Sequence, residues 1–325
     1  SMWDGVSESN FKKGQVSWFK GAKINAAINC IDRHLKKRAN QTAIIWEGDD
    51  PTVSKEISYR ELYESVCRLS NALKARGIKK GDRVCIYMPM IPETVVAMLA
   101  CARIGAIHGV VFGGFASNEL AVRIDDAEPK AIVTASCGIE VNRIIPYMPL
   151  LNGAIDIAIH KPSSVIVVER PEATAELIEG RDVSWNNAMA TAEPADCVSL
   201  KSTDPLYILY TSGTTGIPKG VVRDNGGHAV ALNWSMKAIY NVEAADVYWA
   251  ASDVGWVVGH SYIVYGPLLK GCTTILFEGK PVGTPDAGAF WRVIAEHNVK
   301  SLFTAPTAFR AIKKEDPDAK LLKQY

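Results

Sequence analysis

The sequence predicts an α/β fold with two doubly wound, mostly parallel sheets and flanking helices. Two observations lead there: short apolar runs alternate with segments of helical periodicity, and a polar stretch at 170–204, bounded by prolines, interrupts that alternation once. With 325 residues, 48% of them hydrophobic, the chain is long enough for about two domains. We therefore expect a lead-in segment at 1–22, a first α/β subdomain at 23–204 and a second at 205–325.

Strand and helix signals alternate through the first half of the chain. Strands are predicted from short runs of apolar, often β-branched residues, and helices from apolar residues that recur every three to four positions. Gly77, directly after the second predicted helix, is typical of a helix C-terminus. The predicted helices are 24–38, 59–76, 92–104 and 117–127, and the predicted strands are 83–87, 107–112, 131–135 and 165–169.

The same alternation resumes after residue 204 and predicts the second doubly wound unit. Its first strand runs directly into a loop of small residues, and ligands of such sheets lie at the carboxyl ends of the strands. The predicted strands are 206–210, 247–251, 273–278 and 301–304, and the predicted helices are 228–240, 261–269 and 287–297.

The composition excludes several classes of function. Charges balance, with 36 basic and 35 acidic residues and a formal net charge of +1, so we expect neither a nucleic-acid partner nor a membrane partner. Seven cysteines without a C-x-x-C pair predict reduced thiols, and the six scattered histidines predict no metal site. We expect a cytoplasmic protein, or a mitochondrial matrix protein in a eukaryote, with small-molecule partners.

The segment 206–220 is the most informative part of the chain. An apolar run leads into a loop with several hydroxyl groups, with glycines whose backbone N–H groups an anion can approach closely, and with the positive charge of Lys219. This combination suits the binding of a polyphosphate. A solvated loop would have a similar composition. The lysine follows Pro218 and precedes Gly220, so the spacing differs from the common nucleotide loop G-x-x-x-x-G-K-[ST]. That difference argues against a classical phosphate-loop NTPase or kinase.

The ten residues 211–220 resemble the signature of the acyl-adenylate-forming enzymes, which include the acyl-CoA synthetases. The resemblance implies the fold of their large N-terminal domain, and ATP, Mg²⁺ and coenzyme A as substrates and activating ion. It makes Lys219 a catalytic residue. The residues that it implies for binding the ATP phosphates are Thr211, Ser212, Gly213, Thr214, Thr215, Gly216 and Lys219.

A second motif, at 251–262, combines a tryptophan, two valines and a histidine after a predicted strand. Taken alone, these residues could be core packing, with Trp256 as a filler and His260 as a hydrogen-bonded loop residue. The segment resembles the acyl-pocket motif of short-chain acyl-CoA synthetases. That resemblance implies that Trp256 is a catalytic gate between the carboxylate and the thiol tunnel, and that Val257 and Val258 line a pocket for a small apolar acid.

Two further segments resemble the coenzyme A site of the same enzymes. The resemblance places Phe112, Gly113 and Gly114 against the adenine of coenzyme A, although a strand that ends in a flexible turn would read similarly. It makes Arg143 a ligand of the 3′-phosphate. Glu140 stands where the acetate-using branch has a second arginine.

Glu140, Val258 and the segment 278–288 resemble the propionyl-CoA synthetase branch, so we expect a propionate–CoA ligase, with an acetate–CoA ligase as the alternative. The family continues well beyond Tyr325. The second subdomain is therefore expected to be truncated, the C-terminal domain to be absent, and the isolated fragment to be inactive. A non-catalytic binding or scaffolding domain on the same fold is the alternative from another class.

Overall fold

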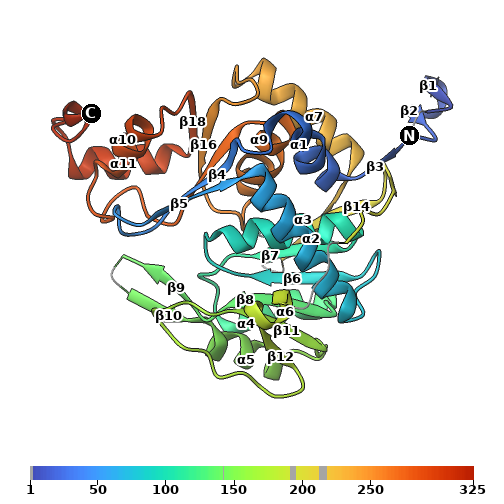
Figure 1. The fold of residues 1–325 in the computed structure, drawn as a ribbon, viewed down its shortest axis with the longest axis horizontal. Coiled ribbons are helices and arrows are strands. Elements are labelled where there is room, and N and C mark those ends of the chain that lie inside the picture. The colour runs from blue at the N-terminus through green and yellow to red at the C-terminus, as the bar shows by residue number, and fades with distance from the viewer. Residues whose placement is uncertain (1–2, 142, 191–194, 212–217) are drawn as a thin grey trace.

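The computed structural model describes residues 3–141, 143–190, 195–211 and 218–325, and arranges them in two main sheets flanked by helices (Figure 1). The seven-stranded sheet occupies the lower half of the view and the five-stranded sheet the upper half. Most neighbouring strands are parallel. The predicted α/β class, with mostly parallel sheets, is thereby confirmed.

The seven-stranded sheet is parallel except at one edge, where β15 runs antiparallel to β14. Five of its strands were predicted, each to within one residue at either end. Both outer strands were missed, because β12 is short and β15 is exposed along nearly its whole length. The order is β12 (Asp182–Ser184), β11 (Ser164–Val168), β8 (Ala131–Ala135), β6 (Arg83–Tyr87), β7 (Ile107–Val111), β14 (Pro205–Thr211) and β15 (Lys219–Asp224).

The five-stranded sheet joins strands from opposite ends of the chain. Its order is β18 (Ser301–Thr304), β16 (Val247–Ala251), β17 (Thr273–Phe277), β4 (Thr42–Glu47) and β5 (Ser54–Ser58). The last two strands come from the N-terminal part, whereas β14 and β15 of the larger sheet come from beyond residue 204. Each sheet therefore takes strands from both sides of the predicted boundary at 204/205, and the two-subdomain division stays a prediction.

The helices agree with the periodicity in the sequence, with local corrections. Helix α2 begins with a capping box, in which Ser58 accepts from the Glu61 amide and the Glu61 carboxylate accepts in return. The predicted helix 261–269 starts earlier and has three segments. The helices are η2 (Ile28–Asp32), α1 (Arg33–Arg38), α2 (Tyr59–Ala75), α3 (Pro92–Ile104), α4 (Ser117–Ala127), α5 (Tyr147–Ile157), α6 (Trp185–Ala190), α7 (Gly226–Ala238), α8 (Val257–Gly259), η3 (His260–Tyr265), α9 (Gly266–Lys270), α10 (Ala289–Glu296), α11 (Pro306–Glu315) and η4 (Leu322–Gln324).

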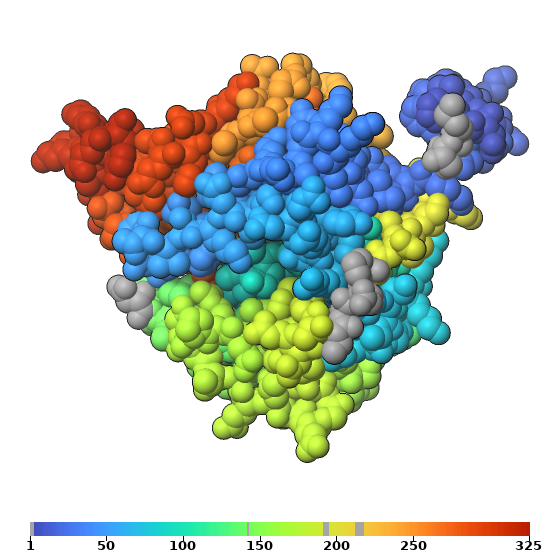
Figure 2. All heavy atoms as spheres, in the orientation of Figure 1, coloured from blue at the N-terminus to red at the C-terminus, as the bar shows by residue number. Residues whose placement is uncertain are grey.

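The lead-in segment forms a hairpin that stands away from the rest of the molecule (Figures 1 and 2). Its strands β1 (Gly5–Asn10) and β2 (Gln15–Lys20) are joined by the short helix η1 (Phe11–Lys13), and nearly every residue is exposed. Two smaller pieces complete the connections: the short ribbon of β3 (Lys23–Ile24) with β13 (Leu200–Lys201), and the hairpin of β9 (Cys137–Glu140) with β10 (Arg143–Pro146).

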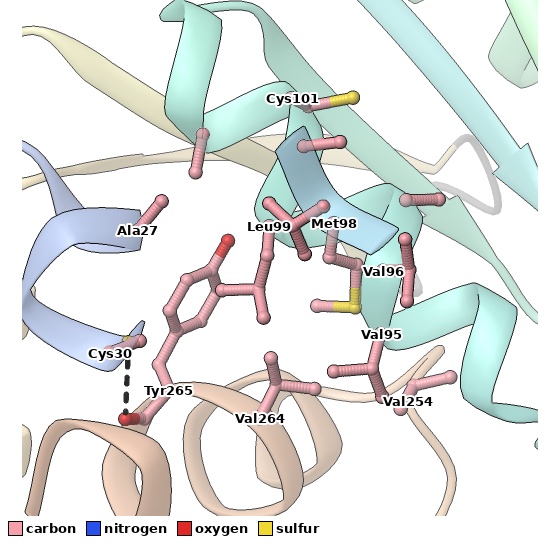
Figure 3. Packing of buried hydrophobic residues seen from close by; sticks show 14 of the residues in the cluster. Ala27, Cys30, Val95, Val96, Met98, Leu99, Cys101, Val254, Val264 and Tyr265 are labelled. Atoms are coloured by element: carbon pink, nitrogen blue, oxygen red, sulfur yellow. Dashed lines mark hydrogen bonds between the residues drawn. The ribbon is translucent and has the colours of Figure 1, made fainter. Parts of the chain in front are cut away.

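One hydrophobic core includes residues of both sheets, with α3 at its centre. Every residue of α3 except Glu93 is buried. Figure 3 shows Val95 and Leu99 of α3 packed towards Val264 and Tyr265 of η3, with Cys30 of η2 beside the Tyr265 carbonyl. A core helix and a strand thus stand where the helix 92–104 and the strand 107–112 were predicted.

A buried ion pair joins the ends of β11 and β17, which belong to different sheets. The Arg170 guanidinium donates two hydrogen bonds to the Glu278 carboxylate, at 2.5 and 3.1 Å. Their side chains are 9% and 2% exposed. Burial raises the pKa of Glu278, and the charge of Arg170 opposes that rise.

Replacing Arg170 with methionine should destabilise the protein strongly, because Glu278 would stay buried without its partner. We expect a loss of about 3 to 5 kcal/mol in the free energy of unfolding, measured by urea denaturation. The double variant R170M/E278L should recover part of that loss, since it removes the unpaired charge.

The control is Lys300→Met, which breaks the more exposed ion pair with Asp246 and should cost at most about 1 kcal/mol. A loss for R170M as small as that of the control would mean that the Arg170–Glu278 pair does not hold the sheets together.

Candidate active site at the meeting of two sheet edges

Three of the predicted motifs lie at the carboxyl ends of parallel strands. Residues 112–114 follow β7, Thr211 ends β14, and residues 252–256 follow β16. Strands β7 and β14 are neighbours in the larger sheet, whereas β16 belongs to the smaller one. Open parallel sheets bind their ligands at this edge, so the motifs stand where a ligand site is expected.

The predicted phosphate segment has its two ends in a β-hairpin, formed by β14 and β15. Thr211, the last residue of β14, lies opposite Lys219, the first residue of β15, and both are exposed. Ser212, Gly213, Thr214, Thr215 and Gly216 lie outside the described residues. The sequence predicted no strand between the loop and the helix 228–240. The structure adds β15 there, antiparallel to β14, and its exposed Val-Val run had shown no clear strand periodicity.

The stem of this hairpin is fixed to the neighbouring helix α4. Tyr210 donates a 2.6 Å hydrogen bond to Asp126, and the Arg123 guanidinium lies 5.6 Å from the Tyr210 ring and 4.5 Å from the Phe115 ring. Gly220 is opposite Tyr210, and a Cβ atom there would approach Ile208 to 3.0 Å. The glycine therefore lets β15 lie close against β14.

The predicted acyl-pocket tryptophan meets the predicted coenzyme A segment directly. The Trp256 ring centre lies 5.7 Å from that of Phe112 and 6.5 Å from that of Phe115. Trp256 is 48% exposed, so it is a surface ring over the junction and not a core filler. Val257 is also exposed, whereas Val258 packs against the main core.

Four of the five predicted coenzyme A residues line one cleft between the sheets. They are Phe112, Gly113, Gly114 and Glu140. The fifth, Arg143, is 75% exposed and lies 3.6 Å from the Glu140 carboxylate, across the β9–β10 hairpin. The cleft is also lined by Pro89, Met90, Gly138, Ile145, Tyr147, Asp253, Glu278 and Lys280.

Sequence reasoning missed Tyr147, Asp253 and Lys280. Tyr147 fills the space over two glycines: a Cβ atom on Gly113 would lie 2.1 Å from its hydroxyl oxygen, and one on Gly138 would lie 2.5 Å from it. Burial raises the pKa of Asp253, and the Gly255 amide, which donates to it at 2.7 Å, opposes the rise. Asp253 and Lys280 each follow a strand end by a few residues, which was the available signal.

A cluster of neutral histidines lies in the core below the acyl-pocket motif. The rings of His108 and His260 stack 5.6 Å apart beside Tyr207 and Tyr265. His108 shares a 2.6 Å hydrogen bond with the Tyr265 hydroxyl. Burial lowers the pKa of His260 and of His228 to about 4, and that of His108 well below its usual value.

One group among the described residues could offer metal ligands: Glu47, Glu296 and His297. The guanidinium of Arg292 already bridges both carboxylates, at 2.9 and 2.5 Å, and His297 lies 2.5 Å from Glu47. These contacts make the group an ion-pair network between β4 and α10.

None of the helices in the described part of the chain is long and apolar enough to cross a membrane.

Comparison with known proteins decides the family. The model of the AMP-binding enzyme family matches residues 31–325. The chain belongs to the AMP-binding enzyme family. This membership agrees with the resemblance of segment 211–220 to adenylate-forming enzymes.

Relatives of this AMP-binding enzyme include short-chain acyl-CoA synthetases. Acyl-CoA synthetase short-chain family member 3, mitochondrial, of Rattus norvegicus is 55% identical over 99% of this chain and 47% of its own length, and the Homo sapiens protein of that name is 55% identical over 95% and 45%. Acetyl-coenzyme A synthetase 2 of Pseudomonas aeruginosa is 50% identical over 96% and 48%. The chain spans about half the length of the curated relatives it matches.

The buried histidines predict a pH dependence of stability. Below pH 6.5 the unfolded chain protonates His260, but the folded protein does not until about pH 4, so stability falls as the pH falls through this window. The contribution of His260 should reach about 3 kcal/mol by pH 4. The measurement compares the free energy of unfolding of the native chain with that of His260→Gln between pH 7 and pH 4. A variant curve parallel to that of the native chain would contradict a neutral His260.

Proposed function

We propose that this chain is the N-terminal part of an ATP-dependent short-chain acid–CoA ligase, which releases AMP and pyrophosphate. The observation that carries the proposal is the 5.7 Å contact between Phe112, predicted for coenzyme A, and Trp256, predicted for the acyl group. A ligase must bring these two substrates together. The relatives, named as acyl-CoA and acetyl-CoA synthetases, support it.

The proposed reaction has two steps. First, a carboxylate oxygen attacks the α-phosphorus of ATP, and the bond to the β-phosphate breaks with its electron pair leaving on pyrophosphate. Second, the thiol sulfur of coenzyme A attacks the acyl carbon, AMP leaves with the electrons of the carbon–oxygen bond, and the thiol proton is released. Both steps need neutralised phosphate charge and correct positioning more than a protein nucleophile.

The exposed hairpin end formed by Thr211 and Lys219 is proposed to bind the ATP phosphates, together with Ser212, Gly213, Thr214, Thr215 and Gly216. Magnesium would enter with ATP and neutralise part of the phosphate charge. Lys219 lies at the start of a strand that is fixed against Tyr210, which suits a charge that has to be held in place.

The acid is proposed to be propionate, since Val258 offers a methyl group where the acetate branch has a hydroxyl group. Acetate is the second candidate, favoured by the name of the Pseudomonas aeruginosa relative. A binding or scaffolding role is the candidate from another class, and we expect the isolated chain to make no acyl-CoA.

A reducing compartment, cytoplasm or mitochondrial matrix, is proposed as its location. All seven cysteines are free and six of them are buried. The proposed partners are small molecules, and neither a nucleic acid nor a membrane is proposed as a partner.

Lys219→Ala in the full-length ligase should slow the first step without unfolding the protein, because the exposed side chain only neutralises phosphate charge. We expect a loss of about 2 to 4 kcal/mol in transition-state stabilisation, measured as acid-dependent pyrophosphate exchange. The matched control is Lys313→Ala, an exposed lysine on α11. Equal exchange rates in both variants would remove the hairpin from the phosphate site.

Acid specificity tests the propionate assignment. The full-length enzyme should prefer propionate to acetate by roughly 10- to 200-fold in kcat/KM, since one methylene in an apolar pocket is worth about 1 to 3 kcal/mol. Val258→Thr should narrow that preference, whereas Val230→Thr, on the exposed face of α7, should not. Equal or better use of acetate by the native enzyme would establish the acetate alternative.

A further inference from the structure

In the proposed coenzyme A cleft, the positive charge of Arg143 is already paired with a carboxylate. This residue is the predicted ligand of the 3′-phosphate, yet its guanidinium lies 3.6 Å from the Glu140 carboxylate. A pair of opposite charges has no net charge with which to attract an anion. Phosphate binding at this hairpin therefore needs another cation close by.

Lys280 is placed to be that cation. Among the described residues that line the cleft, it is the only one with a positively charged side chain. Its Nζ lies 3.7 Å from the other oxygen of the Glu140 carboxylate, and its side chain is 38% exposed. At this separation the ion pair is loose, so the ammonium group keeps its capacity to donate to a ligand.

The chain holds Lys280 against the hairpin from the opposite sheet. The Thr284 hydroxyl accepts from the Lys280 amide at 2.7 Å and donates to the Lys280 carbonyl at 2.9 Å. Gly283 is so close to the hairpin that a Cβ atom on it would lie 3.1 Å from Val141. Lys280, which follows β17 of the smaller sheet, thus reaches the separate β9–β10 hairpin, which follows β8 of the larger sheet.

Glu140 therefore stands between two cations, and the three side chains together carry one positive charge. We propose that Lys280 and Arg143 jointly bind the 3′-phosphate of coenzyme A, with Glu140 as the positioning residue that spaces them. This inference rests on the proposed function, because it takes coenzyme A as the ligand of the cleft. It adds a phosphate ligand from the smaller sheet that the sequence motifs did not indicate.

The test is Lys280→Met in the full-length ligase, assayed with coenzyme A and with dephospho-coenzyme A, which lacks the 3′-phosphate. Hydrogen bonds to charged groups contribute about 1.5 to 3 kcal/mol, so we expect the KM for coenzyme A to rise about 10-fold or more. The KM for dephospho-coenzyme A and the acid-dependent pyrophosphate exchange should not change. Lys74→Met, on the exposed surface of α2, is the matched control.

Two further variants separate charge from structure. Arg143→Ala should raise the KM for coenzyme A and leave that for dephospho-coenzyme A unchanged. In the double variant with K280M, the KM for coenzyme A should rise by less than the product of the two single increases, because the two residues share one ligand. In the K280M background, Glu140→Arg should restore part of the lost affinity by returning a cation to the same place.

An unchanged KM for coenzyme A in K280M would overturn the inference, and so would an equal loss with both cofactors. Equilibrium dialysis of the two cofactors against the 325-residue chain and its K280M variant tests the same selectivity without turnover. If the full-length protein makes no acyl-CoA, the proposed function fails. Even then, a loss in K280M of coenzyme A binding but not of dephospho-coenzyme A binding would support the phosphate site. Equal binding of coenzyme A by the native chain and by K280M would overturn it.

Discussion

Burial of α3 is the constraint on which the rest of the structure depends. The helix is apolar on nearly all sides, so no single sheet face can cover it and it needs apolar partners all around. Its buried arginine is also satisfied: the Arg103 guanidinium donates to both oxygens of Asp32, at 3.1 and 2.9 Å, and to the Ala195 carbonyl. Both sheets contribute to the core around α3, and this shared core fixes their carboxyl edges against each other.

The candidate site follows from that arrangement. Trp256 comes from the smaller sheet and Phe112 from the larger, and Gly255 lies so close that a Cβ atom on it would approach the Phe112 Cα to 3.0 Å. The Arg170–Glu278 ion pair secures the same junction a short distance away. A ligand site between two sheets is therefore as rigid as the contacts that join them, and here the Arg170–Glu278 pair and the core around α3 are buried.

Much of the fold could be predicted because buried parallel strands and amphipathic helices leave strong local periodicity. The polar or exposed strands β5 and β15 left none, and β4 was missed because nothing local indicates pairing with β17, far along the chain. The candidate site was predicted where residues form contiguous motifs, as at Phe112 and Trp256. Tyr147 and Lys280 were missed, since only the folded chain brings them to the cleft.

The pairing of β4 with β17 has a consequence for how the chain acquires its structure. Ile44 pairs with Thr274, so the smaller sheet closes a loop that contains every strand of the larger one. Such distant contacts carry a large entropic cost of loop closure and slow the search for the native state. On a ribosome, β4 and β5 would emerge early and wait, with an unpaired edge, until β17 is synthesised. The strands of the larger sheet can pair with one another in the meantime. The smaller sheet is therefore completed later, and its unpaired strand edge stays exposed to aggregation for longer.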